Sequence, residues 1–327
     1  MSTLIIGASG YAGSAISQAC AQTGRNVLGV SRSGVTGIGI GIRGDVQRPS
    51  LGLSPVDLEL VTETTTEAVL CFGSVAWDCG PSAAIALHDT ATRGVLRFLR
   101  TLPRLRRVVH FSSLLVLGRA TGTLSNRELY VGQRFRNWYE YGKYCAERLV
   151  RDSDLPVNVI RCGPLLGVDP RGGPFDVSAG LPAAFGHLLA GYPVHLRDRG
   201  KFPCYVADVA TTAEIVVRAL ETPEQGVTWS WFDPEMPTLA DVFREVCRPW
   251  GMVPKIVEAP VLGRLTRLLS TRLGVVPELA DYAEPWFDLP RSVLDAIPGE
   301  LPRRDPDYLA ATGRALRDHG MVSGRRR

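Results

Sequence analysis

The stretch Thr3–Gly13, with the sequence T-L-I-I-G-A-S-G-Y-A-G, decides the fold of this chain. Apolar residues run directly into Gly7, Gly10 and Gly13, spaced G-x-x-G-x-x-G, and a helix-forming stretch continues from Tyr11 to Thr23. Glycine here permits a tight turn and lets backbone amides approach an anion at the start of the helix. The pattern predicts a loop that cradles the pyrophosphate of a dinucleotide. A tight turn that binds nothing is the alternative.

A second glycine string, Gly39–Gly44, reads G-I-G-I-R-G and matches the better-known spacing G-x-G-x-x-G. No helix-forming stretch follows it, because Asp45 and Pro49 come next. We therefore expect a glycine-rich strand here and no second phosphate loop.

The rest of the first half alternates apolar runs of strand length with helical stretches. The expected strands are Thr3–Ile6, Val27–Val30, Gly37–Ile42, Ala68–Phe72, Val108–Phe111 and Val157–Ile160, and the expected helices are Tyr11–Thr23, Pro81–Leu102 and Tyr139–Arg151. Such alternation is typical of a parallel sheet. The predicted fold class is α/β, a Rossmann-type doubly wound parallel sheet with helices on both faces, plus a smaller, loop-rich C-terminal substrate domain.

The pattern changes after Gly163, where prolines and glycines divide the chain into short segments. Asp208–Leu220 is an exception, an amphipathic helix that we expect to pack back on the first domain. The predicted domains are 1–165, with 200–225 packing back, for the dinucleotide, and 166–199 with 226–327 for the substrate. Aromatic residues of the second domain suggest an apolar substrate, unless they form the domain's own core: Trp229, Trp231, Phe232, Trp250, Trp286 and Phe287.

Composition argues against several classes of function. The 327 residues carry a formal charge of +4, too small to indicate nucleic-acid binding, and no long apolar run predicts a membrane span. The seven cysteines include no C-x-x-C pair and the five histidines lack metal-ligand spacing, so we expect reduced thiols and no metal. No secretory leader precedes the first strand, so the expected location is cytoplasmic.

The residues after the second expected strand bear on which dinucleotide binds. An acid there would hold the ribose hydroxyls of NAD, but the chain has Ser31-Arg32 and no acid before Asp45. Arginine pairs with a 2′-phosphate, which a carboxylate would repel. We therefore predict NADP(H), with NAD(H) as the second choice. An arginine that is merely exposed is the alternative.

Tyr139 and Lys143 stand four residues apart, on one face of an expected helix. The lysine ammonium should lower the pKa of the phenol, normally near 10, so that the phenol exchanges its proton nearer neutral pH. Upstream, the strand Val108–Phe111 leads into Ser112-Ser113, and one of these hydroxyls would donate to a developing oxyanion. A packing tyrosine beside an exposed lysine is the alternative.

Taken in order, these motifs resemble the extended branch of the short-chain dehydrogenase/reductase superfamily, over roughly residues 1–220. The resemblance rests on Gly7–Gly13, Gly44-Asp45, Ser112-Ser113 ending at Gly118, Tyr139-x-x-x-Lys143 followed by Glu147, Arg161-x-Gly163-Pro164 and Val206-Ala207-Asp208. The stretch Phe135-x-Asn137-x-Tyr139, with Ala146-Glu147, is further similar to the thioester-reductase and fatty-acyl-reductase subgroup.

The resemblance implies hydride transfer between a carbonyl and an alcohol. Ser113 would orient the substrate oxygen, Tyr139 would give or take its proton, and Lys143 would hold the nicotinamide ribose. Ser113 is preferred to Ser112 because it stands five residues before Gly118, and Asp45 would contact the adenine. The residues predicted to bind the cofactor are Gly7, Ser9, Gly10, Tyr11, Ala12, Gly13, Ser31, Arg32, Asp45, Val46, Phe72, Gly73, Tyr139, Lys143, Cys162 and Gly163.

The leading functional prediction is NADP(H)-dependent reduction of a ketone in a fairly apolar small molecule, such as a secondary metabolite. One alternative is reduction of a carrier- or CoA-bound thioester, with an arginine-rich segment facing an acidic carrier protein: Arg97, Arg100, Arg104, Arg106 and Arg107. Others are a nucleotide-sugar epimerase or dehydratase and a cofactor sensor without activity. Monomer and homodimer both remain open.

The chain departs from the branch's usual pattern at several positions near the expected site. Phe72-Gly73 stands where small alanines are usual, His88 roughly where an asparagine is common, Gly142 in place of a serine and Cys162 in place of a proline. These departures weaken the epimerase and dehydratase alternative and leave the serine, tyrosine and lysine in place.

Overall fold

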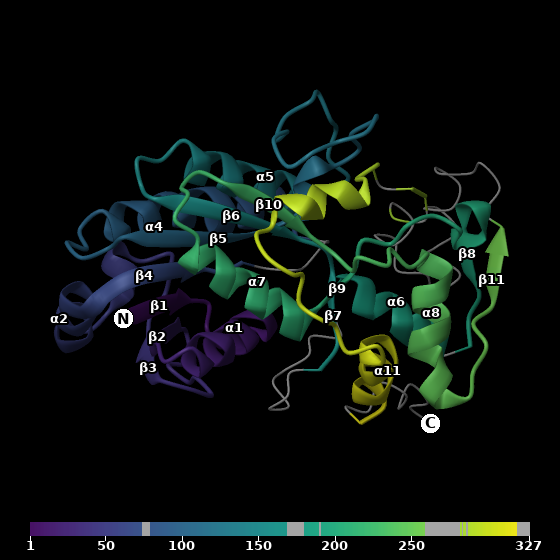
Figure 1. The fold of residues 1–327 in the computed structure, drawn as a ribbon, viewed down its shortest axis with the longest axis horizontal. Helices are drawn as coiled ribbons and strands as arrows, with labels where there is room; N and C mark the ends of the chain where they lie inside the picture. The colour runs from purple at the N-terminus through teal and green to yellow at the C-terminus, as the bar shows by residue number, and fades with distance from the viewer. Residues whose placement is uncertain are drawn as a thin grey trace.

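A computed structural model describes residues 1–73, 79–168, 180–189, 191–258, 282, 284–285 and 287–318. Its centre is a seven-stranded parallel sheet with the strand order β10-β6-β5-β4-β1-β2-β3 (Figure 1). The strands are β1 Ser2–Ile6, β2 Asn26–Ser31, β3 Ile40–Arg43, β4 Thr65–Leu70, β5 Arg107–Ser113, β6 Val157–Cys162 and β10 Thr228–Trp231. The predicted doubly wound α/β sheet is confirmed, and Gly39–Gly44 contributes a strand, as its context indicates.

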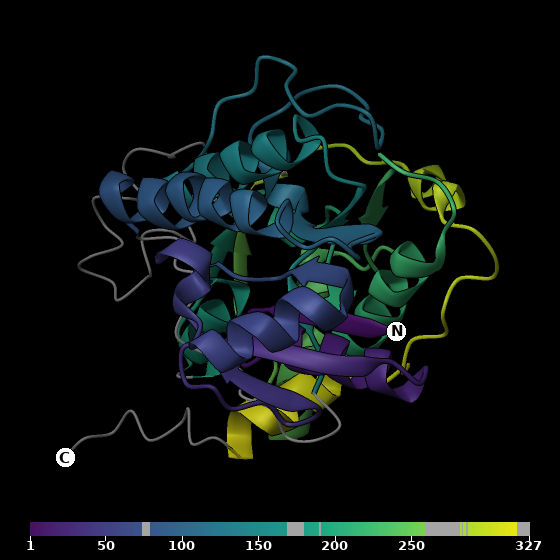
Figure 2. The same cartoon turned by 90° about the vertical axis from the view of Figure 1, so that its left-hand side faces the viewer.

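Helices cover both faces of this sheet. Figures 1 and 2 show α4 (Ala91–Leu99) and α5 (Trp138–Arg151) on one face, with α1 (Tyr11–Gln22) and α7 (Val209–Glu221) on the other. Successive residues of a strand point to opposite faces. In β1, Ile5 accordingly joins the core under α1 and α7, whereas Leu4 and Ile6 join the core under α4. The helix expected at Asp208–Leu220 thus packs on the first domain, against α1.

The long helix expected over Pro81–Leu102 is interrupted. The chain forms α3 (Pro81–Ala84), then a π-helical turn η2 (Ile85–Thr90), then α4. A π-turn widens the helix by one residue and is often found at functional sites. A further helix, α2 (Pro55–Thr64), was not predicted, although Ser54 caps it by accepting from the amide of Asp57 and Pro55 occupies its first turn.

The strand β10 corrects the expected domain boundary. Thr228–Trp231 was assigned to the substrate domain, but it pairs in parallel with β6, so that Trp231 lies beside Cys162 in the main sheet. Trp229 and Trp231 are buried there together with Phe232. These side chains fill the core, which removes them as evidence for an apolar substrate. Phe287 is also buried, stacked on Tyr205, and Trp286 lies outside the described residues.

The remainder of the chain forms a second layer beside the carboxyl ends of the strands (Figure 1). It contains α6 (Gly180–Leu189), α8 (Leu239–Cys247) and α11 (Tyr308–Asp318), with α8 packed against both others. Two short parallel pairs join it, β7 (Leu165–Leu166) with β9 (Ala207–Asp208) and β8 (Val194–Leu196) with β11 (Ile256–Glu258). This part is more helical than its prolines suggest. None of the helices described combines the length and hydropathy needed to span a bilayer.

Short helical turns complete the described elements. They are η1 (Pro49–Gly52), η3 (Leu114–Leu117), η4 (Arg197–Gly200), η5 (Arg248–Trp250) and η6 (Arg291–Ala296). Of these, η3 matters most for the site, because it follows β5 directly and Ser113 caps it by accepting from the amide of Leu115.

Candidate functional site

The glycine loop lies where the strand order reverses, between β1 and β4. Open α/β sheets bind ligands at this point, beyond the carboxyl ends of the strands. Gly7 has φ +101° and touches the end of β4, since a Cβ on it would lie 2.8 Å from the Cys71 carbonyl and the Phe72 amide. A Cβ on Gly13 would lie 2.1 Å from the Gly7 oxygen. The loop therefore closes tightly on itself and on Phe72-Gly73, which the sequence placed near the cofactor.

The first turn of α1 has features that suit an anion. Its N-cap, Gly10, provides no side-chain cap, and no acidic residue stands in the first turn. A Cβ on Gly10 would meet only the Gly7 oxygen, at 3.4 Å, so the outer side of the loop is open. Unpaired amides at a helix N-terminus attract phosphate. Ser9 is exposed beside them and Ala12 is half-buried, whereas the Tyr11 hydroxyl donates to the Gly167 carbonyl at 2.8 Å.

Alanine in place of Gly13 and alanine in place of Gly10 should have different effects. Gly13→Ala forces its methyl group into the Gly7 carbonyl, so we expect a loss of about 1–3 kcal/mol in the free energy of unfolding. Gly10→Ala has room and should leave stability unchanged while weakening dinucleotide binding. Urea unfolding and fluorescence titration measure the two effects. Equal stability of the two variants would contradict this account of the loop.

The carboxyl ends of β2 and β3 lie at the same edge of the sheet as the glycine loop, beyond β1. Arg32 follows β2, is exposed and has no ion-pair partner within the described residues. The Ser31 hydroxyl is used within its own turn, where it accepts from the Gly34 amide at 3.1 Å. Asp45 and Val46 follow β3 half-buried, and Asp45 accepts from the Gln47 amide at 2.9 Å. Arg32 is thus the available charged group at this position.

Ser113 and Tyr139 meet at the carboxyl end of β5. Both side chains are buried, and Ser113 lies close enough to Tyr139 to lower the pKa of its phenol. The Ser112 hydroxyl points the other way and donates to Glu147 Oε2 at 2.6 Å. The two serines therefore face different groups, Ser112 facing Glu147 and Ser113 facing Tyr139. Lys143 lies one turn along α5 from Tyr139 and donates from Nζ to the Phe111 carbonyl at 3.1 Å.

The expected lowering of the tyrosine pKa is wrong for this structure. Burial raises the pKa of Tyr139 to about 12, and the nearby Ser113 hydroxyl only partly opposes this rise. The ammonium of Lys143 is committed to the Phe111 carbonyl, and burial lowers the pKa of this lysine to about 8. At neutral pH the pair is therefore a protonated phenol beside a charged lysine.

Cys162 and Gly163 lie at the end of β6. The Cys162 side chain is buried against Thr212 of α7, with Sγ 3.7 Å from Oγ1, so only its backbone faces the edge. Gly163 donates from its amide to the Trp231 carbonyl at 3.1 Å. The predicted site residues thus end a strand, follow the carboxyl end of one, or lie in the first two turns of α1 and α5.

Two buried networks that the sequence did not predict hold α5 in place. Glu147 accepts from Ser112 and, at 2.8–3.1 Å, from the guanidinium of Arg161 on β6. At the helix N-terminus, Glu140 accepts from Arg136 and from the hydroxyl of Tyr282, 2.7 Å away. The first network ties α5 to the sheet and the second ties it to the later part of the chain. The sequence indicated Glu147 only as a residue of the motif that follows Lys143.

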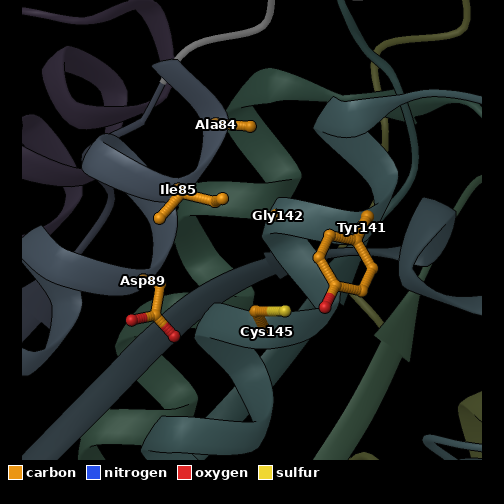
Figure 3. Close-up of a pocket in the computed structure, with 6 residues that line it drawn as sticks. All are labelled: Ala84, Ile85, Asp89, Tyr141, Gly142 and Cys145. Carbon is orange, nitrogen blue, oxygen red and sulfur yellow. The ribbon is translucent and has the colours of Figure 1, made fainter. Parts of the chain in front are cut away.

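A shallow depression lies between η2 and α5, on the outer side of these helices (Figure 3). Its lining residues are Ala84, Ile85, Asp89, Tyr141, Gly142 and Cys145. Neither Ser113, Tyr139 nor Lys143 lines it, so it is distinct from the site at the strand ends. It lies where η2 packs against α5 at Gly142.

Comparison with known families gives one match. Residues 40–211, just over half of the chain, match the family described as "Male sterility protein". No curated protein matches the chain in sequence.

Solved structures with the same fold include a terminal R domain and an epimerase. The terminal R domain from the myxalamid PKS-NRPS biosynthetic pathway has a TM-score of 0.76 and 18% identity, covering 98% of this chain and 92% of that one. UDP-glucuronic acid 4-epimerase from Bacillus cereus, with UDP-glucuronic acid and NAD, has a TM-score of 0.71 and 15% identity, covering 98% and 100%. MoeE5, with UDP-glucuronic acid and NAD, has a TM-score of 0.69 and 20% identity, with the same coverage. The predicted resemblance to the extended short-chain dehydrogenases/reductases is confirmed.

Proposed function

Because the chain belongs to the male sterility protein family, within the extended short-chain dehydrogenases/reductases, we propose that it is an NADP(H)-dependent reductase of a carbonyl group. The observation that carries the proposal is the meeting of Ser113 and Tyr139, with Lys143 one turn away, beside the glycine loop. A protein that only sensed the cofactor would not need a buried phenol beside a serine at this edge.

The chain's own groups suit reduction. When bound, the dinucleotide supplies a hydride. Ser113 would donate a hydrogen bond to the carbonyl oxygen and so stabilise the negative charge that develops there. Tyr139, which burial keeps protonated at neutral pH, would then give its proton to that oxygen. The charged Lys143 would hold the ribose next to the nicotinamide and favour the phenolate that remains.

The residues at the glycine loop fit a dinucleotide with an extra phosphate. The uncapped first turn of α1 can hold the pyrophosphate, and the unpaired Arg32 can hold a 2′-phosphate. The Asp45 carboxylate accepts from the Gln47 amide within its own turn, so Arg32 would decide the preference for NADP(H) over NAD(H).

Replacing Arg32 by alanine should change the preference for the cofactor. A charge-assisted hydrogen bond contributes about 1.5–3 kcal/mol, so the Kd for NADPH should rise about 10- to 100-fold while the Kd for NADH stays within twofold. Fluorescence titration measures both. Arg104→Ala, exposed ahead of β5, is the matched control and should change neither. Wild-type protein that binds NADH more tightly than NADPH would overturn the choice of NADP(H).

A thioester is the second candidate substrate, and two observations favour it over an unspecified ketone. The family match and the R domain both point toward reductases of bound acyl groups. The prediction of an apolar ketone rested partly on aromatic side chains, and three of these, Trp229, Trp231 and Phe232, are core residues. Mixing the protein with NADPH and an acyl-CoA distinguishes the candidates: release of an aldehyde or alcohol favours the thioester, and reduction of ketones alone favours the first reading.

The arginine-rich segment does not support the docking of a carrier protein. Arg107 donates to the Thr222, Pro223 and Glu224 carbonyls at the end of α7, and Arg100 pairs with Asp154 at 2.7 Å. Arg107 is the first residue of β5 and Arg100 precedes it, so both lie at the amino edge of the sheet, opposite the candidate site. A carrier would have to approach elsewhere.

A further inference from the structure

Hydrogen bonds from two distant segments meet at Gly167. This buried glycine directly follows β7, the strand after β6. Its carbonyl accepts from the Tyr11 hydroxyl at 2.8 Å, and its amide donates to Thr312 Oγ1 at 2.7 Å. Tyr11 is the first residue of α1 and Thr312 lies on α11. We call these three residues the Gly167 junction, which connects the glycine loop to the second layer.

The backbone of Gly167 is held from a third side as well. Its φ is +101°, a conformation that favours glycine, and a Cβ on it would lie 2.7 Å from Asp208 Oδ1. The other oxygen of this carboxylate accepts from the Thr211 amide at 3.1 Å and caps α7, so the carboxylate has a fixed direction. Gly167 also directly follows the pairing between β7 and β9. It therefore has little freedom to absorb a displacement of Tyr11 or Thr312.

Thr312 is fixed to the second layer. Its side chain is fully buried, and its hydroxyl both accepts from Gly167 and donates to the Tyr308 carbonyl at 3.0 Å. The next residue, Gly313, lies against α8, since a Cβ on it would lie 2.1 Å from the Val246 oxygen. Valine has the shape of threonine and would fill the same space without either hydrogen bond, leaving the buried Gly167 amide unpaired. The hydroxyl of Thr312 thus ties the packed pair of α8 and α11 to Gly167.

Tyr11 brings the other end of the junction to the expected phosphate site. Its amide belongs to the first turn of α1, where amides have no partner within the helix and can bind an anion. Its half-buried side chain reaches Gly167. Gly10 precedes it, and glycine restricts the backbone less than any other residue. The bond between the Tyr11 hydroxyl and Gly167 is therefore well placed to hold the direction of this turn.

We propose that Tyr11 and Thr312 are positioning residues for the dinucleotide: through Gly167 they couple the first turn of α1 to the layer of α8 and α11, so that NADP(H) at the glycine loop holds this layer in place. The inference rests on the NADP(H) binding proposed above. It gives the Tyr11 hydroxyl and Thr312 a role that the glycine motif does not indicate. Because coupling between two sites is reciprocal, loosening the junction at Thr312 should weaken NADPH binding at Tyr11.

The affinity for NADPH, measured by fluorescence titration, tests this coupling without a substrate. Tyr11→Phe removes only the hydroxyl and should raise the Kd about 2- to 10-fold, the usual contribution of one hydrogen bond. Thr312→Val should raise the Kd by a similar factor. In the double variant the two factors should not multiply, because both substitutions break the same chain of bonds. Thr312→Ser keeps the hydroxyl and should restore the wild-type Kd.

Thr64→Val is the matched control for Thr312→Val. Thr64 Oγ1 makes the same kind of bond within a helix, donating to the Leu60 carbonyl at 2.7 Å on α2, and α2 is not part of the junction. This variant should therefore bind NADPH as tightly as the wild type does.

Hydrogen exchange followed by mass spectrometry supplies a second readout. Saturating NADPH should slow exchange in α11 by about threefold or more in the wild type and should leave it unchanged in Tyr11→Phe. A double variant whose Kd rises by the product of the two factors, or exchange in wild-type α11 that does not respond to NADPH, would overturn the inference. If Thr312→Val does not fold, Tyr11→Phe and hydrogen exchange make the test alone. Failure of the wild type to bind NADPH would instead refute the proposed function.

Discussion

Replacing Tyr139 by phenylalanine should lower kcat for NADPH-dependent reduction by about 10²- to 10⁴-fold, the usual contribution of a positioned general acid. The phenol is buried beside Ser113 and kept protonated at neutral pH by a pKa of about 12. Phenylalanine preserves the ring and its edge contact with His88, so the fold and the site's shape should survive. The affinity for NADPH should stay within about threefold, because the loss falls on proton transfer.

Tyr141→Phe is the matched control for this variant. Tyr141 stands on the same helix two residues later, but it is 39% exposed and lines the shallow depression between η2 and α5 (Figure 3). Removing its hydroxyl should leave kcat unchanged. Stopped-flow absorbance at the NADPH band measures both variants. Full activity in Tyr139→Phe would show that another group delivers the proton.

Glu147→Gln should lower the free energy of unfolding by about 3–5 kcal/mol, since it leaves Arg161 as a buried charge without its partner. Glu147 and Arg161 are both fully buried, and Arg151 and Ser112 contact the same carboxylate. Loss of this network should also loosen α5 against the sheet. We therefore expect lower cofactor affinity along with lower stability.

A double variant separates the charge from the packing. Glu147→Leu combined with Arg161→Met removes both charges, and such apolar replacements of buried pairs often recover much of the stability. Glu245→Gln, which breaks an exposed pair with Arg248, should change stability by less than about 0.5 kcal/mol. Urea unfolding of the three proteins tests this. A loss below about 1 kcal/mol in Glu147→Gln would contradict the anchoring role of the network.

Much of the first domain was predictable because its signals are local. The apolar run before Gly7 and the helix after it specify a strand, a turn and a helix without reference to the rest of the chain. The same holds for Tyr139 and Lys143, whose separation of four residues places them on one helix face. Context also distinguished the strand–turn–helix at Gly7–Gly13 from Gly39–Gly44, which contributes β3.

What the sequence missed depends on contacts between distant segments. Thr228–Trp231 reads as a strand but does not reveal that its partner is β6, so it was placed in the wrong domain. The predicted lowering of the Tyr139 pKa was wrong, because burial raises this pKa and the Lys143 ammonium donates to the Phe111 carbonyl. His88 and Gly142 each looked like an isolated departure, and only their contact shows that they belong together.

The central claim is that this chain consumes NADPH to reduce a carbonyl group, and one measurement tests it most directly. Purified protein is mixed with NADPH and, separately, with ketones, aldehydes, acyl-CoA thioesters and UDP-sugars, while NADPH absorbance and the products are followed. The account predicts stoichiometric oxidation of NADPH with reduction of a carbonyl compound or thioester, and loss of that reaction in Tyr139→Phe. Interconversion of a UDP-sugar without net oxidation of NADPH, with no carbonyl compound or thioester reduced, would contradict it.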